Sequence, residues 1–324
     1  MSSLSPVISI GREKPRLSEK FAGRLYPFDH LVLVYCWATI VLTVILGRPI
    51  EPYWPVILFH AAAIALVILM ALIGPGHDYR AIAFFRLLYP VILMTFFYLA
   101  AGKLVHLVFP EFFDHRVTAM ESGFLGIDPT LWLDQHLHVV ITEFFSAAYC
   151  SYYFLVPGLA LVLFFGRRDA EIVQFMTAVC AAFFVSYMIF IFYPLEGPRY
   201  FFAAQYQNPI SGPFFYPLVV FVIDNIAFHG GAMPSSHCAV ALVVALTAIR
   251  NYGKRAWFLL FIVGALSAAT VYGRYHYLSD VVVGLGLGAA SYLLTSYFFA
   301  HQTEEQELPI ITRVVNRQYV SGYY

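Results

Sequence analysis

Charged residues are scarce in this sequence. Only 12% of its 324 residues are charged, and 19 Lys and Arg balance 19 Asp and Glu, so the formal net charge is zero. Soluble globular proteins carry about 25% charged residues, and nucleic-acid-binding proteins present a basic surface. The composition therefore argues against a soluble globular domain and indicates no nucleic-acid partner.

Cysteine is also scarce, which argues against a disulfide-stabilised or cysteine-ligated protein. The four cysteines are Cys36, Cys150, Cys180 and Cys238, and each lies inside or at the start of an apolar run. They form neither a close-spaced metal-binding pattern nor a disulfide framework. We interpret them as small packing residues, and we expect neither a metal nor another cofactor.

Long hydrophobic runs are what the sequence has instead. Hydrophobic residues make up 60% of the chain, and the runs have the length that crosses a hydrocarbon layer of about 30 Å. They lack the alternation of barrel strands, so helices are the plausible spanning structure. The predicted spans are 30–47, 55–74, 87–109, 139–166, 172–194, 235–250, 256–272 and 281–300. The sequence therefore predicts an all-α, polytopic membrane bundle of about eight transmembrane helices.

Basic residues predict how these spans are oriented. They occur in the N-terminal segment 1–29 and in the loops after the second, fourth and sixth spans, and such loops face the cytoplasm. The loop residues are Arg80, Arg86, Arg167, Arg168, Arg250, Lys254 and Arg255. Because residues 1–29 show no cleavable signal, the first span is predicted to be retained, with both termini cytoplasmic. We expect a plasma (inner) membrane protein whose loops 195–234 and 273–280 lie on the extracytoplasmic or luminal face.

Two stretches of the outer loops are expected at the membrane interface. The stretch 213–228 is apolar but marginal in length and contains Asp224, which favours a re-entrant or interfacial segment over a ninth span. Loop 110–138 mixes aromatic and charged residues, which is typical of a helix that lies on the membrane surface.

The first motif that can carry chemistry, Met-Pro-Ser-Ser-His, opens the sixth run and ends at His237. Proline suits the first turn of a helix and serine caps its free amides, so one reading is a capped helix start with an interfacial histidine. The other reading is that exposed amides and the helix dipole bind a phosphate beside His237. The motif alone leaves both readings open.

The second motif, His-Tyr-Leu-Ser-Asp, runs from His276 to Asp280 and opens the eighth run. Residues four apart lie on one face of a helix. An aspartate that accepts from one ring nitrogen leaves the other free as a nucleophile or base. A local pair that only satisfies two polar groups is the alternative. Because alternate spans begin on the same membrane face, the two histidine motifs are predicted to form one site.

A third element, Gly-Pro-Arg-Tyr around Arg199, follows the fifth span on the same predicted side. A guanidinium group matches phosphate geometry and stays charged at physiological pH. An arginine that extends to the interface beside aromatic residues is the common alternative. The position directly upstream of the histidine loop favours the phosphate-binding interpretation.

Together these residues resemble the type 2 phosphatidic acid phosphatase superfamily of integral-membrane lipid phosphatases and phosphotransferases. That family has a basic first motif, a Pro-Ser-Gly-His second motif and an Arg-x5-His-x3-Asp third motif. The resemblance covers residues 87–300, a six-helix phosphatase-type core formed by spans three to eight. The remaining regions are then a cytoplasmic segment at 1–29, two additional spans at 30–86 and a cytoplasmic tail at 301–324.

The resemblance implies roles for the matching residues. His276 would attack the substrate phosphorus and form a phosphohistidine, with Asp280 orienting its ring. His237 would protonate the leaving alkoxide and later activate the acceptor. The substrate phosphate would be held by Arg199, the backbone of Ser235 and Ser236, and Arg274.

The motifs depart from the family pattern at three positions. Phe192 and Thr270 stand where a lysine and an arginine are usual, and Ser236 replaces the glycine of the second motif. Arg274 is therefore expected as a substitute phosphate ligand. The reduced basic set is more similar to the inositol phosphorylceramide synthase branch, in which a polyol or lipid hydroxyl can replace water as acceptor.

These comparisons predict a metal-independent enzyme that transfers a phosphoryl group from a membrane lipid to a hydroxyl acceptor or to water. A plain phosphatidate-type or polyprenyl-diphosphate phosphatase is the first alternative. A metal hydrolase with His237, His276 and Asp280 as ligands is less favoured, because no HExxH motif appears. A lipid transporter is a distant alternative, because the two halves show no matching broken helices.

Overall fold

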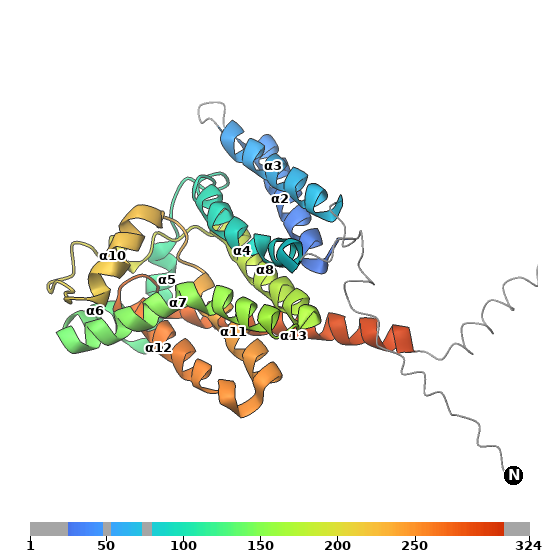
Figure 1. Ribbon diagram of the computed structural model, residues 1–324. Coiled ribbons are helices and arrows are strands. Elements are labelled where there is room, and N and C mark those ends of the chain that lie inside the picture. The colour runs from blue at the N-terminus through green and yellow to red at the C-terminus, as the bar shows by residue number, and fades with distance from the viewer. Residues whose placement is uncertain (1–24, 48–52, 73–79, 308–324) are drawn as a thin grey trace, which may run out of the picture.

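The computed structural model describes residues 25–47, 53–72 and 80–307, with the backbone alone at 80–82 and 302–307. Regular secondary structure in these ranges is helical (Figure 1). The long helices are α2 (Pro27–Leu46), α3 (Trp54–Leu72), α4 (Arg80–Gly102), α7 (Val139–Phe165), α8 (Asp169–Phe192), α11 (Ser236–Tyr252), α12 (Phe258–Tyr272) and α13 (Leu278–Glu307). The short ones are α5 (Asp114–Leu125), α6 (Pro129–Asp134), α9 (Pro198–Phe201), α10 (Phe215–Ile226) and the 3-10 helix η1 (Gly253–Ala256).

The predicted membrane bundle is confirmed as a fold class. Within the described residues, 6 helices are long and apolar enough to cross a membrane: α2, α3, α4, α7, α8 and α13. The other two predicted spans coincide with α11, of 17 residues, and α12, of 15 residues. The largest shift from the predicted ranges is in α4, which occupies 80–102 where the sequence predicts 87–109.

An ion pair holds Arg86 inside the bundle. The Arg86 guanidinium donates through Nη1 to Asp29 Oδ1 of α2 at 2.9 Å and through Nη2 to Oδ2, and Tyr89 also donates to Asp29. Asp29 is fully buried and Arg86 is 8% exposed. Buried charges are tolerated in a bundle only when they are paired. Arg86 therefore links α4 to α2. It is part of the helix, so the prediction that it lies in a loop is wrong.

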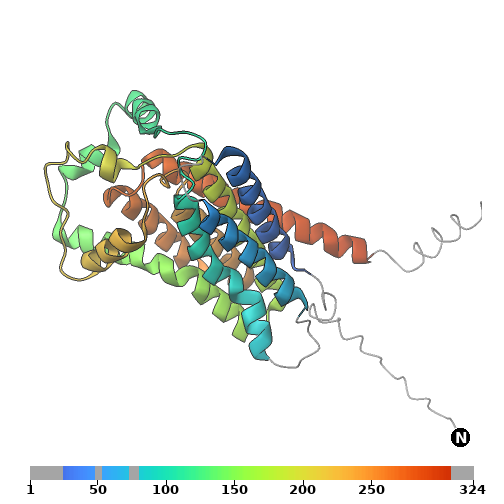
Figure 2. The same cartoon turned by 90° about the horizontal axis from the view of Figure 1, so that it is seen from above.

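Helix α8 forms the centre of the bundle. Most of its residues are buried, and it contacts α2, α4, α7, α11 and α13 (Figure 2). Its sequence is apolar on all sides, which is the pattern of a helix surrounded by other helices. Helices α2 and α3 pack against each other, and α2 contacts α8.

Helices α11 and α13 pack closely enough that their backbones touch. A Cβ atom on Gly284 of α13 would overlap the carbonyl oxygen of Ser235, and one on Gly288 would overlap that of Ala239. Small residues four apart let membrane helices approach in this way. The contact places the first turns of α11 and α13, which carry the two histidine motifs, side by side.

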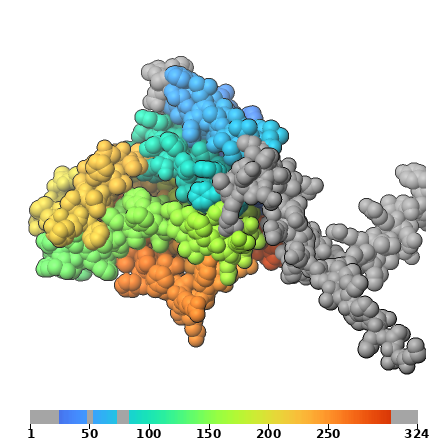
Figure 3. Space-filling model, viewed as in Figure 1, coloured from blue at the N-terminus to red at the C-terminus, as the bar shows by residue number. Residues whose placement is uncertain are grey.

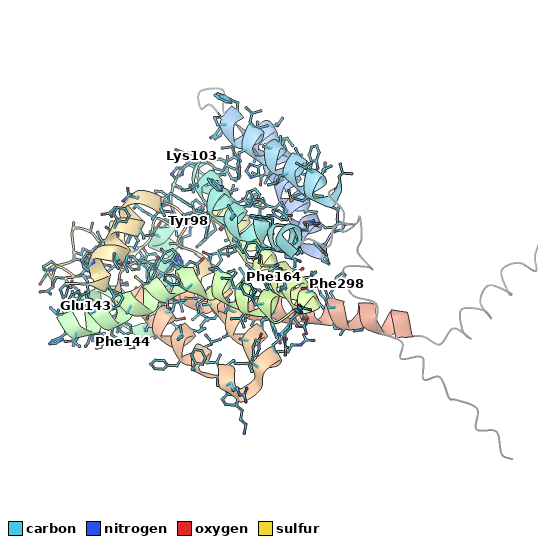
Figure 4. All side chains as sticks on the ribbon, in the orientation of Figure 1. Tyr98, Lys103, Glu143, Phe144, Phe164 and Phe298 are labelled. Atoms are coloured by element: carbon cyan, nitrogen blue, oxygen red, sulfur yellow. The ribbon has the colours of Figure 1, made fainter. Side chains whose placement is uncertain are left out.

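The apolar stretch at 213–228 forms α10, whose 12 residues extend about 18 Å and are too short to cross the membrane. The Glu143 carboxylate of α7 accepts from the amides of Phe214, Phe215 and Tyr216 at 3.2, 2.7 and 3.2 Å and so anchors the start of α10. Glu143 lies at one end of α7, and Phe164 lies near the other (Figure 4). Helices α5, α6 and α10 lie at the Glu143 end of the bundle (Figure 1).

Candidate active site

His276 lies in the short connection between α12 and α13. Its amide donates to the Thr270 carbonyl at 3.1 Å, and its side chain is almost fully buried. Ring atom Nδ1 lies 2.7 Å from the Ala232 carbonyl oxygen and 3.5 Å from Asp280 Oδ2. A carbonyl oxygen can only accept, so Nδ1 carries the hydrogen of the neutral ring. The lone pair is therefore on Nε2.

Asp280 occupies the first turn of α13 and is fully buried. Its Oδ2 accepts from the Tyr277 amide at 2.8 Å, and its backbone carbonyl accepts from the Ser235 amide at 2.9 Å. The spacing predicts a His–Asp pair on one helix face, but α13 begins at Leu278, so His276 precedes the helix. The two side chains still lie together, but His276 Nδ1 is closer to the Ala232 carbonyl oxygen than to the Asp280 carboxylate.

His237 lies in the first turn of α11, next to His276. The two imidazole rings are 5.7 Å apart between centroids. His237 Nε2 is 3.1 Å from the Tyr149 hydroxyl of α7, and Nδ1 is buried with no hydrogen-bond partner among the described residues. The two histidine motifs, 39 residues apart in sequence (276 − 237), thus face one another across a single site.

A cavity that is open to the outside is lined by both rings and is hereafter called the histidine cavity. Its polar lining consists of Tyr98, Tyr149, Glu196, Arg199, Tyr200, Ser236, His237, Tyr275 and His276. A second and larger space, the apolar cavity, lies between α4, α7, α8 and α10. Both are lined by Tyr98, Tyr149, Ile223, Ala227, Ser236 and His237. Tyr98 belongs to α4 (Figure 4), and α10, which contributes to the lining of both cavities, lies beside α7 on the face seen in Figure 3.

Arg199 is held at the cavity by a braced loop. Gly197 has φ 97°, a conformation that favours glycine, and starts the short helix α9. The Asp114 carboxylate accepts from the amides of Glu196 and Gly197, each at 2.8 Å. The Arg199 guanidinium lines the cavity and donates to Asp224 Oδ1 of α10 at 3.0 Å. The loop is therefore fixed by backbone contacts, and the guanidinium is held by one half-exposed carboxylate.

The comparison with known families agrees with this arrangement. A model of the PAP2 superfamily matches residues 115–294, a range that runs from α5 through most of α13 and contains all three motifs. The chain belongs to the PAP2 superfamily. No curated protein and no solved structure gives a significant match. Membership makes this chain an integral-membrane enzyme of the phosphatase and phosphotransferase type, acting on phosphate esters.

Two of the expected phosphate-binding groups of this PAP2 member lie elsewhere. The Ser235 amide donates to Asp280, and the Ser235 hydroxyl accepts from the Cys238 amide as a helix cap, so neither faces the cavity. Arg274 donates to Asp134 and to the Asn208 carbonyl, the latter at 2.7 Å. It does not line the cavity. The Ser235 amide and Arg274 Nη2 are thus already paired inside the fold.

Of the three positions that depart from the PAP2 motifs, Ser236 lines the cavity, whereas Phe192 and Thr270 do not. Phe192 is the last residue of α8 and is 44% exposed. Thr270 is fully buried and uses its hydroxyl to donate to the Ser267 carbonyl at 2.8 Å. Among the described residues that line the histidine cavity, Arg199 is the single basic side chain of the lysine or arginine type.

Several residues of this site carry no signal in the sequence. Ala232 contributes only a backbone carbonyl. Asp114 does not line the cavity but holds the loop that carries Arg199, and it also accepts from the Tyr277 hydroxyl at 2.7 Å. Tyr275 lines the cavity, and burial raises the pKa of its phenol, which therefore stays neutral. Glu196 lines it as well and pairs with His229 at 3.0 Å. Among the described residues, no group of three or more His, Cys, Asp or Glu side chains is placed to hold a metal ion.

Proposed function

We propose that this PAP2 member transfers a phosphoryl group from a membrane lipid phosphate or phosphodiester through a phosphohistidine on His276. One observation carries the proposal. The polar cavity with the two histidines is continuous in its lining with a larger apolar cavity, through Tyr98, Tyr149 and Ser236. A molecule that places phosphate in one and hydrocarbon in the other is a phosphorylated lipid.

His276 is suited to attack because its tautomer is already set. The bond to the Ala232 carbonyl keeps hydrogen on Nδ1, so the Nε2 lone pair is available to phosphorus. The new N–P bond forms as the P–O bond to the leaving group breaks, and the ring gains a positive charge. Asp280, 3.5 Å from Nδ1, stabilises that charge.

His237 acts as the acid and then as the base. It gives a proton to the leaving oxygen, which departs as a neutral alcohol, and afterwards takes a proton from the acceptor hydroxyl or water. The acceptor oxygen then attacks the phosphohistidine, which releases the His276 nitrogen. Such assistance is worth roughly 10²–10⁴-fold in rate.

The phosphoryl oxygens have two sets of donors. Ser236 lies at the start of α11 and lines both cavities, where free amides and the positive end of the helix dipole favour an anion. Arg199 supplies the positive charge. Its present bond to Asp224 must be exchanged for phosphate, and the half-exposed position of Asp224 makes that exchange inexpensive.

The single cation favours a phosphodiester over a phosphomonoester as donor. A monoester carries about two negative charges at neutral pH and a diester one. With Arg199 as the one lining arginine or lysine among the described residues, charge balance favours the diester. This supports the phosphotransferase version, similar to the inositol phosphorylceramide synthase branch, in which a polyol or lipid hydroxyl takes the group. Hydrolysis by water, as in a plain phosphatidate-type phosphatase, is the second version.

The site is proposed to face the extracytoplasmic or luminal side of a plasma (inner) membrane, with both termini cytoplasmic. Arg167 and Arg168 lie between α7 and α8, Lys254 and Arg255 lie between α11 and α12, and Arg250 lies in the last turn of α11. His237 and His276 lie at the opposite ends of these helices. Loops rich in Lys and Arg stay in the cytoplasm, which supports this orientation.

The first experiment identifies the product. Purified protein is incubated in EDTA with a panel of phospholipids, with and without inositol or a lipid alcohol, and the products are identified by mass spectrometry. We expect a new phosphodiester with the added acceptor, and loss of essentially all turnover in His276→Ala. His301→Ala, at an exposed histidine near the far end of α13, serves as the matched control and should retain activity.

Three results would contradict the proposal. Undiminished turnover in His276→Ala would exclude this nucleophile. Loss of activity in EDTA that added metal restores would favour the metal hydrolase. Movement of lipid across vesicles without any new product would favour a transporter.

A further inference from the structure

Tyr149 contacts the proposed acid–base residue directly, although it belongs to none of the three family motifs. It lies in α7, is 4% exposed, and places its hydroxyl 3.1 Å from His237 Nε2. It is also one of the residues that line both the histidine cavity and the apolar cavity. Tyr149 therefore lies where the phosphate end of a bound lipid meets its hydrocarbon end.

The geometry of His237 limits which nitrogen can exchange a proton with a substrate. Nδ1 is fully buried and makes no hydrogen bond with any described residue. The side chain as a whole is partly exposed and lines both cavities. A proton that passes between His237 and a molecule in the histidine cavity must therefore use Nε2, beside the Tyr149 hydroxyl.

Aromatic rings also pack against the His237 ring. The Tyr152 ring lies 4.4 Å from it between centroids, and the Tyr149 ring lies 5.2 Å from it. Aromatic packing of this kind leaves the direction of the ring nitrogens weakly defined. Among the described residues, the Tyr149 hydroxyl makes the one hydrogen bond that sets this direction.

We propose that Tyr149 is the positioning residue of His237 and keeps Nε2 aimed at the leaving oxygen through the whole proton cycle. A phenol can both donate and accept. While the ring is protonated, Nε2–H is shared between the Tyr149 oxygen and the leaving oxygen beside it, so the phenol holds the ring without removing the proton. Once that proton has moved to the leaving oxygen, the phenol donates its own hydrogen to the Nε2 lone pair until the acceptor hydroxyl replaces it there. The inference rests on the acid–base role proposed for His237.

The test separates positioning of the acid from general damage to the site by changing the leaving group. Two esters of the same lipid phosphate are used, one with p-nitrophenol and one with an alkyl alcohol. The alkoxide needs a proton to depart, whereas p-nitrophenolate does not. For Tyr149→Phe we expect kcat/KM, which reports formation of the phosphohistidine, to fall at least about tenfold with the alkyl ester, a part of the roughly 10²–10⁴-fold that a general acid supplies. We expect little change in kcat/KM with the aryl ester, because breakdown of the shared phosphohistidine does not enter this constant.

Three comparisons complete the test. His237→Ala should show the same leaving-group pattern with a larger loss, and adding Tyr149→Phe to it should cause no further loss, because coupled residues are not additive. Tyr35→Phe, a buried tyrosine of α2 that lines neither cavity, is the matched control and should leave both rates unchanged.

The outcomes distinguish this inference from the proposed function. Equal loss with both esters in Tyr149→Phe, or a further loss in the double variant, would overturn the positioning role alone. An unmodified protein inactive towards both esters, or full activity in His276→Ala, would instead overturn the phosphohistidine mechanism.

Discussion

At the scale of single residues, the site depends on a backbone carbonyl as much as on its ionisable side chains. Ala232 accepts from His276 Nδ1 at 2.7 Å, while the Asp280 carboxylate is 3.5 Å away. The sequence indicates the His–Asp pair but cannot indicate the carbonyl, because any residue type supplies one. The carbonyl sets the tautomer, and the proposed mechanism leaves to the carboxylate the stabilisation of the charge on the phosphorylated ring.

This division of roles makes a prediction for Asp280→Asn. Where a carboxylate alone sets the histidine tautomer, the same change lowers kcat by about 10⁴-fold. Here Ala232 keeps hydrogen on Nδ1, so only the charge stabilisation is lost, and we expect a smaller decrease of about 10–100-fold. Steady-state kinetics of the purified variant measure it. A loss as complete as that of His276→Ala would show that Asp280 itself controls the tautomer.

At the scale of elements, close contact between α11 and α13 brings the two histidines together. The hydropathy pattern predicts both helices, and their shared membrane face follows from alternation along the chain. The register between them depends on Gly284 and Gly288, whose missing side chains let Ser235 and Ala239 approach. Hydropathy does not reveal which face of α13 is close-packed, so this contact is a finding of the structure.

Gly288→Val tests this contact. The added side chain would meet the Ala239 backbone, which cannot move aside, so we expect α13 to shift, the melting temperature in detergent to fall and activity to be lost. Overpacking of this kind typically costs about 1–3 kcal/mol of stability. Gly286→Val, on the same helix but with open space around the position, is the matched control. Similar losses in both variants would mean that helix propensity, and not the contact, explains the effect.

At the scale of the whole molecule, the basic loops and the histidine cavity lie at opposite ends of the bundle. Helices α2 and α3 are joined to the rest of the bundle partly by the buried Arg86–Asp29 pair between α4 and α2. The polar end also gathers α5, α6, α9 and α10, which are too short to cross the membrane. The molecule is thus asymmetric along the expected membrane normal.

This asymmetry predicts which loops an impermeant reagent reaches. We expect Ala204→Cys, in the exposed loop after α9, to react with a membrane-impermeant maleimide in intact cells. Lys254→Cys, exposed between α11 and α12, should react only after the membrane is permeabilised. The four native cysteines are replaced first. The opposite labelling pattern would place the histidine cavity on the cytoplasmic side.

The sequence by itself determined the membrane class and the approximate helices, because hydrocarbon thickness and backbone hydrogen bonding constrain apolar runs directly. It contains the three motifs. It also indicated that His237, His276 and Arg199 belong together. Only the tertiary structure decided which polar atoms lie beside the histidines. It brought Tyr149 and Ala232 to them and paired the Ser235 amide and Arg274 Nη2 elsewhere. The physical reason is that helix register and long-range pairing decide which polar atoms remain free, and neither is encoded in local hydropathy.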